Sequence, residues 1–275
     1  MIPLKDLNPA SRRPVVTVAV VLACAAVWFL VQQGQRGDDV VPIEPAGQQV
    51  VLPADLSFNL ERAAVPCEVV QGEPLDLEEV RATFASGDDQ ACAGPRQSPE
   101  LFPSKAIWGS VLVSMFLHGG LLHLGGNLLY LWIFGNNVED RLGHVAFAAF
   151  YLVGGAVATL AHVAVNADST VPLVGASGAI AAVMGAYAVW YPNARVRTIV
   201  PVFLVLFLEV RAKWLLGFWF VLQFFTGNEG GVAWVAHVGG FVFGVVAGLV
   251  LGPGRRRRPE PLPPVRRRRA RAWGG

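Results

Sequence analysis

A serine and a histidine lie within apolar stretches of this chain, where polar side chains are rare. Ser177 is in VPLVGASGAIAAVMGAY, residues 171–187, and His237 is in WVAHVGGFVFG, residues 234–244. A serine becomes a nucleophile when a histidine base takes its hydroxyl proton. Taken singly, Ser177 is more simply a packing serine and His237 a buried structural histidine. Together they predict hydrolysis by nucleophilic attack, provided that the fold brings them within hydrogen-bonding distance.

More polar residues lie in HGGLLHLGGNLLY, residues 118–130. His123 and Asn127 are four residues apart and therefore share one face of a helix. His118 and His123 are five apart, about 140° around a helix, and do not form a metal-binding pair. The H-E-x-x-H motif is absent from the sequence, and the apolar stretches lack acidic ligands. A metalloprotease is therefore a weak alternative, and we predict no metal and no cofactor.

The surroundings of Ser177 favour a negatively charged intermediate. Ser177 lies at the start of its apolar stretch, and a helix N-terminus offers free backbone N–H groups and the positive end of the helix dipole. Ridges of small residues let helices approach closely. Both stretches contain such a ridge: Gly178, Ala182 and Gly185 in one, and Gly240, Gly244 and Gly248 in the other. Close contact of these two helices would bring Ser177 to His237.

The composition indicates that these helices lie in a membrane. The chain is 53% hydrophobic and only 15% charged, whereas soluble domains carry roughly 25% charged residues. A membrane-spanning helix needs about 20 apolar residues. We expect an all-α membrane protein with six spans, at residues 15–31, 111–134, 145–165, 174–191, 214–226 and 231–252.

The distribution of charge predicts the orientation of the spans. Lys and Arg accumulate in short cytoplasmic segments, and here they gather near the N-terminus, in residues 191–213 and in residues 255–275. Residues 34–104 hold thirteen Asp and Glu against four Arg. We therefore expect a multi-pass protein of the plasma membrane, with both termini cytoplasmic and residues 34–104 outside as a long loop between the first and second spans.

These patterns divide the chain into five segments. Residues 255–275 are expected to be disordered and to contact anionic lipid rather than nucleic acid. Cys67 and Cys92 share the external segment, where a disulfide between them could persist. The segments are a cytoplasmic basic tail at 1–14, an uncleaved first transmembrane helix at 15–33, an external acidic insert at 34–104, a membrane core at 105–254 and the Arg/Pro-rich cytoplasmic tail at 255–275.

From about Lys105 to Gly252, the motifs resemble those of bacterial rhomboid intramembrane serine proteases. The four matching groups are His118, His123 and Asn127; Gly135, Glu139 and Gly143; Gly175, Ser177 and Gly178; and His237, Gly240 and Gly244. The resemblance implies that Ser177 is the nucleophile and His237 the general base. It implies an oxyanion hole formed by the Ser177 backbone N–H with the side chains of His123 and Asn127, and structural roles for His118 and Glu139.

The acidic insert at 34–104 has no match in the family pattern, and the sequence departs from that pattern at two further places. Some members have an aromatic residue one turn after the serine, packed on the catalytic histidine, where this chain has Ala181. Some have Trp-Arg in the first external loop, where this chain has Trp108-Gly109. A pseudoprotease that binds transmembrane clients without cutting them is the main alternative, although such proteins lose the serine or the histidine. A transporter is less favoured, because no inverted repeat is present.

The position of the predicted site residues near the outer ends of their spans and the resemblance together predict the partners of the protein. The substrates would be transmembrane proteins in the lipid bilayer, cut near the outer face of the membrane, with a small residue before the scissile bond. Substrates would enter past the stretch at about 211–226, where Phe218, Trp219 and Phe220 could form a flexible flap. The sequence pattern indicates no oligomeric state.

Overall fold

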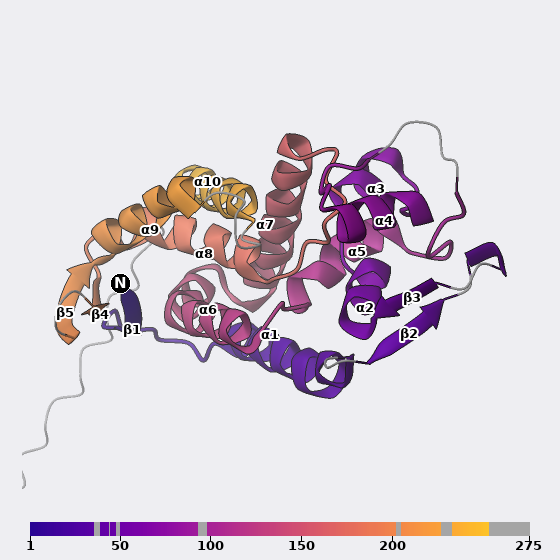
Figure 1. Cartoon of the computed structure of the whole chain (residues 1–275). Coiled ribbons are helices and arrows are strands. Elements are labelled where there is room, and N and C mark those ends of the chain that lie inside the picture. The colour runs from indigo at the N-terminus through magenta and orange to yellow at the C-terminus, as the bar shows by residue number, and fades with distance from the viewer. Residues whose placement is uncertain are drawn as a thin grey trace, which may run out of the picture.

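The protein is mostly helical in a computed structural model, with a helical core and a folded insert that packs against it (Figure 1). The structure describes residues 1–35, 39–43, 45–47, 50–92, 98–201, 205–226 and 233–252. The predicted disorder of residues 255–275 concerns a segment outside these residues. The principal helices of the core are α1 (Val15–Ala26, continuing as a helix to Gln35), α6 (Leu121–Leu142), α7 (His144–Val165), α8 (Ser177–Trp190), α9 (Ala212–Thr226) and α10 (Trp234–Val250).

The lengths of these helices divide them into two groups. In the described part of the chain, Val15–Gln35 and α7 are long and apolar enough to cross a membrane as single helices. A third candidate is a pair of helices, Ile107–Phe116 and α6, which meet at an angle of 81°. Helices α8, α9 and α10 are apolar but contain only 14, 15 and 17 residues.

The predicted span at 111–134 is wrong at its start. The chain forms helix α5 (Ile107–Val113) and a short 3-10 turn to Phe116, then bends, and α6 begins only at Leu121. The Gln32 side chain accepts a hydrogen bond from the His118 backbone N–H at 3.0 Å and donates one to its carbonyl at 3.1 Å. These two groups are thereby withdrawn from helical hydrogen bonding. Glycines at 119 and 120 lower the helix propensity further.

The all-α prediction also missed two small antiparallel sheets. One has the strand order β1-β4-β5, formed by Ile2–Asp6, Arg195–Pro201 and Val205–Arg211. Residue Pro3 is opposite Thr198, and Arg195 is opposite Arg211. Val196 and Thr198 are buried while Arg195 and Arg197 are exposed, which is the alternation of a half-buried strand. Two basic segments far apart in sequence therefore meet at one end of the molecule, at the left of Figure 1.

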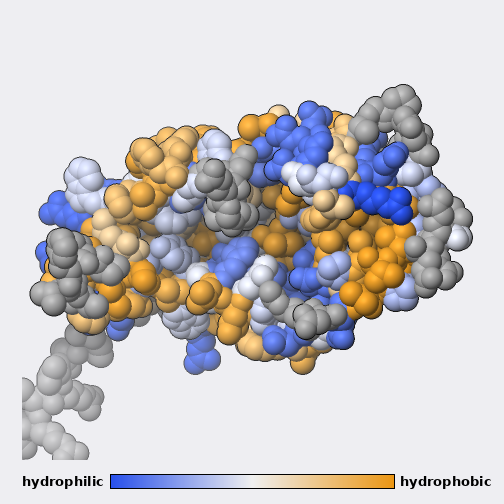
Figure 2. Space-filling model, in the orientation of Figure 1, coloured by the Kyte–Doolittle hydropathy of each residue, from blue (hydrophilic) through white to orange (hydrophobic). Residues whose placement is uncertain are grey.

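The insert is a folded unit rather than a simple long loop. It contains a two-stranded sheet of β2 (Val40–Ile43) and β3 (Val50–Pro53), and the helices α2 (Ala54–Arg62), α3 (Pro66–Gln71) and α4 (Leu77–Ser86). Its own buried cluster comprises Leu60, Val65, Cys67, Leu75, Leu77, Val80 and Leu101. In Figure 2, hydrophilic residues gather over α3 and α4, whereas apolar residues cover much of the surface around α9 and α10.

Polar contacts attach the insert to the membrane core. The Leu173 backbone N–H donates to the Ala64 carbonyl at 2.7 Å, and the Cys67 N–H donates to the Ser169 carbonyl at 2.9 Å. The Lys105 ammonium group forms an ion pair with Glu68 and donates to the Leu60 carbonyl at 2.5 Å. Burial raises the pKa of Glu68 and lowers that of Lys105, because both charged groups are removed from water.

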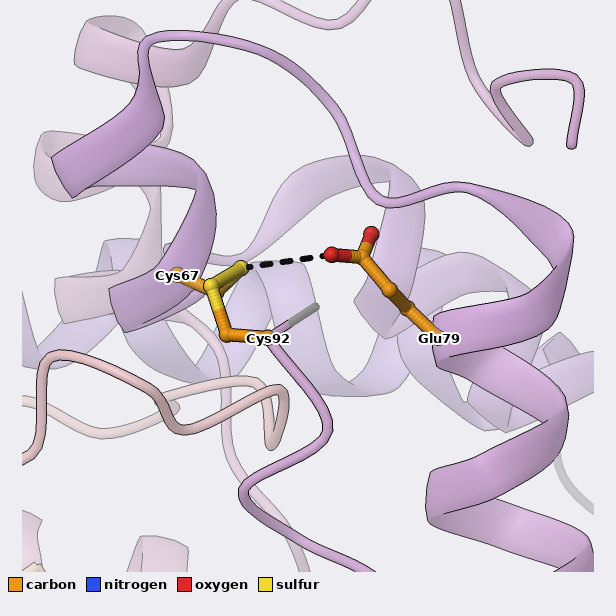
Figure 3. Close-up of side chains that lie close together, drawn as sticks. All are labelled: Cys67, Glu79 and Cys92. Atoms are coloured by element: carbon orange, nitrogen blue, oxygen red, sulfur yellow. Dashed lines mark hydrogen bonds between the residues drawn. A yellow bond between two sulfur atoms is a disulfide. The ribbon is translucent and has the colours of Figure 1, made fainter. Parts of the chain in front are cut away.

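A disulfide joins Cys67 of α3 to Cys92 (Figure 3). The Glu79 carboxylate of α4 lies beside it, with Oε1 at 3.7 Å from the Cys67 sulfur. Two cysteines and a carboxylate at this distance resemble a metal-ligand cluster. In the disulfide neither sulfur is a thiolate, however, and metal ligation requires the thiolate form. The arrangement therefore serves as a covalent cross-link in the insert.

Candidate active site

The packing of α8 against α10 positions the two residues predicted to react. The small-residue ridges of the two helices face each other. A β-carbon at Gly240 would collide with the Gly178 carbonyl oxygen, and one at Gly244 would collide with the Ala182 carbonyl oxygen. A β-carbon at Gly185 would collide with the Phe241 carbonyl oxygen. The backbones of the helices therefore touch directly, as the small-x-x-x-small spacing predicts.

This contact places Ser177 and His237 together. Ser177 is the first residue of α8, and His237 lies in the first turn of α10. The Ser177 Oγ is 2.8 Å from the His237 Nε2, within the range expected between a nucleophile and its base. Residues 60 positions apart in sequence thus form one hydrogen-bonded pair.

His123 and Asn127 of α6 line the same cavity as this pair. The Gly119 backbone N–H donates to His123 Nδ1 at 3.3 Å. That nitrogen must therefore be the acceptor, and in the neutral ring the proton is on Nε2. Asn127 is buried, and its side-chain nitrogen has no hydrogen-bond partner among the described residues. An unpaired buried N–H group is costly, so this arrangement offers a donor to an oxygen atom supplied from outside the protein.

Gly175 allows His123 and Ser177 to lie close together. Its φ angle of +135° is a conformation that favours glycine. A β-carbon there would lie 2.9 Å from His123 Nε2 and 3.4 Å from Ser177 Oγ. The Gly175 N–H donates to the Ser114 carbonyl at 2.9 Å, which anchors the chain just before α8. Absence of a side chain at this position lets Nε2 of His123 approach the serine.

A cavity of about 700 Å³ opens onto the pair. Its size falls within the range of typical small-molecule and cofactor sites, which are about 300–1,000 Å³. The Ser177–His237 pair and the two polar residues of α6 all contribute to its wall, as do apolar residues of α8. The residues that line it include His123, Asn127, Ser177, Met184, Trp219 and His237.

The other motif residues support the site or lie far from it. The buried His118 ring packs edge-on against His123, with ring centroids 5.4 Å apart. The fully buried Glu139 carboxylate instead caps the start of α1, accepting backbone N–H bonds from Val16 and Thr17, each at 2.8 Å. It also contacts His144 Nδ1 at 2.6 Å. Glu139 therefore joins α1 to α6 and does not reach the serine.

The sequence interpretation missed a residue that contacts His237 from α9. The Gln223 Oε1 is 2.7 Å from His237 Nδ1. The Trp219 ring of the same helix packs on the imidazole, with centroids 5.7 Å apart. An aromatic residue thus covers the histidine here, although Ala181 occupies the position at which some family members have one. Trp219 and Gln223 are four residues apart, and this spacing on one helix face was the available signal.

Comparison with known proteins places these observations in a family. The model of the Rhomboid domain matches residues 105–254. The chain belongs to the rhomboid family. Its match to this family covers the residues that form the Ser177–His237 pair, the cavity and the helices that carry them.

Three relatives illustrate the extent of the similarity to other rhomboid proteins. Presenilin-associated rhomboid-like protein, mitochondrial, of Bos taurus is 35% identical over 98 residues, covering 35% of this chain and 26% of the relative. Rhomboid protein 1, mitochondrial, of Saccharomyces cerevisiae is 29% identical over 150 residues, covering 50% and 40%. Rhomboid protease GluP of Bacillus subtilis is 33% identical over 148 residues, covering 53% and 26%. The chain thus spans less than half the length of each of these relatives. The family and the last relative support a membrane protease.

Proposed function

We propose that this rhomboid protein is an intramembrane serine endopeptidase that uses a dyad of Ser177 and His237. The observation that carries the proposal is the 2.8 Å contact between Ser177 Oγ and His237 Nε2 at the wall of a cavity. Family membership adds support for proteolysis within a membrane.

The reaction follows from the positions of the donors and acceptors. Ser177 Oγ attacks the carbonyl carbon of the scissile peptide bond while its proton moves to His237 Nε2. The oxyanion accepts hydrogen bonds from the Ser177 backbone N–H, His123 Nε2–H and the Asn127 side-chain nitrogen. His237 then donates its proton to the leaving amine, which breaks the C–N bond and leaves an acyl ester on Ser177. Water hydrolyses the ester in the second half of the reaction.

We further propose that the six apolar segments cross the membrane with both ends of this chain in the cytoplasm. The N-terminal segment, with Lys5, Arg12 and Arg13, pairs through β1 with β4, which carries Arg195 and Arg197, at the left of Figure 1. The acidic insert contacts residues 169 and 173 at the other end, at the right of Figure 1. This separation of basic segments from the acidic insert supports the proposal of six crossings. Ser177 begins its helix shortly after the loop that the insert contacts, so the cut would occur toward the outer face of the plasma membrane.

The substrates would be single transmembrane helices that unwind locally. A helical peptide carbonyl is already hydrogen-bonded, and releasing it within lipid costs several kcal/mol per group. Glycine, proline or polar residues near the cut should therefore accelerate cleavage. A cavity flanked by glycines at Ser177 favours a small residue before the scissile bond.

Reconstitution in proteoliposomes with a single-span substrate tests the proposal. Ser177→Ala and His237→Ala should each abolish cleavage, and the double variant should be no slower than either one, because the dyad acts as a unit. Mass spectrometry of the fragments should locate the cut near the face that carries the insert. Substantial turnover by either alanine variant would refute the dyad, and a cut on the opposite side would refute the topology.

A further inference from the structure

Gln223 is a buried polar residue whose position the dyad alone does not explain. It lies on α9, only 6% exposed, within a helix that is otherwise mostly apolar. Its Oε1 is 2.7 Å from His237 Nδ1, on the side of the imidazole ring opposite the nitrogen that faces Ser177. Gln223 thus extends the hydrogen-bonded pair to a third residue, contributed by a third helix.

The orientation of the Gln223 amide is fixed by a second hydrogen bond. Its Nε2 donates to the Trp219 carbonyl at 2.9 Å. A carbonyl only accepts hydrogen bonds, so the NH₂ group must face Trp219 and the oxygen must face His237. An amide oxygen also only accepts, so His237 Nδ1 must carry a proton. In the neutral ring, Nε2 is then unprotonated and accepts from the Ser177 hydroxyl.

We propose that Gln223 is a positioning residue that holds His237 in the tautomer required for it to act as a base. The inference rests on the proposed Ser177–His237 dyad. Gln223 acts through His237 and does not touch the reacting atoms. The Trp219 ring, 5.7 Å from the imidazole between centroids, limits the rotation of the same ring. Helix α9 therefore supplies both restraints on the base.

A neutral acceptor fits this environment better than a carboxylate. An ionised side chain is expensive within the bilayer, whereas an amide oxygen fixes the tautomer without a charge. His123 of α6 and His162 of α7 are the titratable side chains of the described residues that interact electrostatically with His237. No carboxylate in the described part of the chain forms a hydrogen bond with the His237 ring.

Two substitutions separate positioning from simple packing. Gln223→Met keeps the size of the side chain but removes the acceptor, so kcat should fall about 10- to 100-fold while KM stays the same. Gln223→Glu keeps an acceptor and adds a charge that stabilises the imidazolium, so the acid side of the pH–kcat profile should move to higher pH by about one unit. Leu222→Ala is the matched control: it changes an exposed neighbour on α9 and should alter neither value.

The tautomer can be measured without turnover. In protein labelled with ¹⁵N-histidine, the His237 signals, assigned by their loss in His237→Asn, should report a protonated Nδ1 in the wild type and in Leu222→Ala. Gln223→Met should raise the fraction with a protonated Nε2. An unchanged tautomer in Gln223→Met would overturn the proposal, as would wild-type kcat. Gln223→Glu with no shift of the pH profile would also overturn it, and this test remains if Gln223→Met does not fold. Absence of proteolysis in the wild type would refute the proposed function but leave the tautomer measurement intact.

Discussion

The membrane core and the insert are each stabilised by a different set of interactions. In the core, α8 and α10 touch through glycines, and the polar side chains converge on one cavity. In the insert, an apolar cluster is reinforced by a disulfide, an ion pair and a capping box in which Asp76 and Glu79 satisfy each other's backbone N–H groups. In water the hydrophobic effect drives apolar side chains together, whereas in lipid, whose tails are equally apolar, this driving force is absent. The core therefore depends on close backbone packing and the insert on burial and cross-links.

The difference implies that the two regions fail in different ways. Added volume should harm the core where α8 and α10 meet, because their backbones are in direct contact. Loss of a charge or a covalent bond should harm the insert, because its small core cannot compensate. Proteolytic activity should depend on the integrity of the core rather than of the insert, because the Ser177–His237 pair and the cavity lie in the core.

The largest effect is expected from Gly244→Ala. Its methyl group would collide with the Ala182 carbonyl oxygen, and a backbone atom cannot move aside as a side chain can. The loss of stability should exceed the roughly 4–5 kcal/mol that marks exceptional single substitutions. Thermal unfolding and size-exclusion chromatography in detergent would measure it. Gly217→Ala in α9 is the control, because nothing lies within 4 Å of the position that the added β-carbon would occupy. Equal melting temperatures for the two variants would contradict the close-packing argument.

Lys105→Met should destabilise the insert by about 3–5 kcal/mol, because Glu68 is left buried without a counter-charge. The Glu68 side chain is only 2% exposed. Burial already raises the pKa of Glu68, and loss of the ammonium group should raise it further. A carboxyl group with a folded-state pKa above its unfolded value contributes stability below the unfolded pKa and loses it as pH rises through the folded pKa.

The Lys105→Met variant should therefore be closer to the wild type at pH 5 than at pH 8. Hydrogen exchange of α2 and α3 at both values would measure the difference. The double variant Glu68→Gln, Lys105→Met should recover much of the loss. A single variant whose deficit grows as pH falls would show that the pair is not coupled in this way.

Asn127→Ala should slow cleavage about 10²–10³-fold, the effect of removing one oxyanion donor. Its melting temperature should stay close to that of the wild type, since the side-chain nitrogen has no partner among the described residues. Initial rates in proteoliposomes provide the measurement. Asn136→Ala, on the same helix but away from the residues that line the cavity, should retain the rate. Normal cleavage by Asn127→Ala would remove this residue from the oxyanion hole.

The smallest effect on activity is expected from the double variant Cys67→Ser, Cys92→Ser. A cross-link between cysteines 25 residues apart typically contributes about 2–4 kcal/mol, here to the insert alone. Limited proteolysis should show earlier cutting within the insert, while the cleavage rate changes little. Cys24→Ala, which leaves the disulfide intact, should resist proteolysis as the wild type does. A collapse of activity in the double variant would show that the core depends on the cross-link.

The sequence alone determined the class of the protein and the residues of the predicted site. Apolar stretches, small-residue ridges and isolated polar side chains are local patterns, and each reflects a cost of placing groups in lipid. Ser177, His237, His123 and Asn127 could therefore be singled out before any distance was known. The predicted contact of α8 with α10 followed from the glycine spacing in the same way.

Only the tertiary structure decided which residues complete that arrangement. The bend before α6 depends on Gln32 reaching His118 from another helix, and the three-stranded sheet depends on pairing across about 190 positions. Gln223 is also an isolated polar residue in an apolar helix, but one glutamine there is equally compatible with a self-satisfied packing role. Its contact with His237 arises from the position of α9 beside α10. Spacing specifies which side chains share a face, whereas the orientation of a base depends on neighbours that only the folded chain brings together.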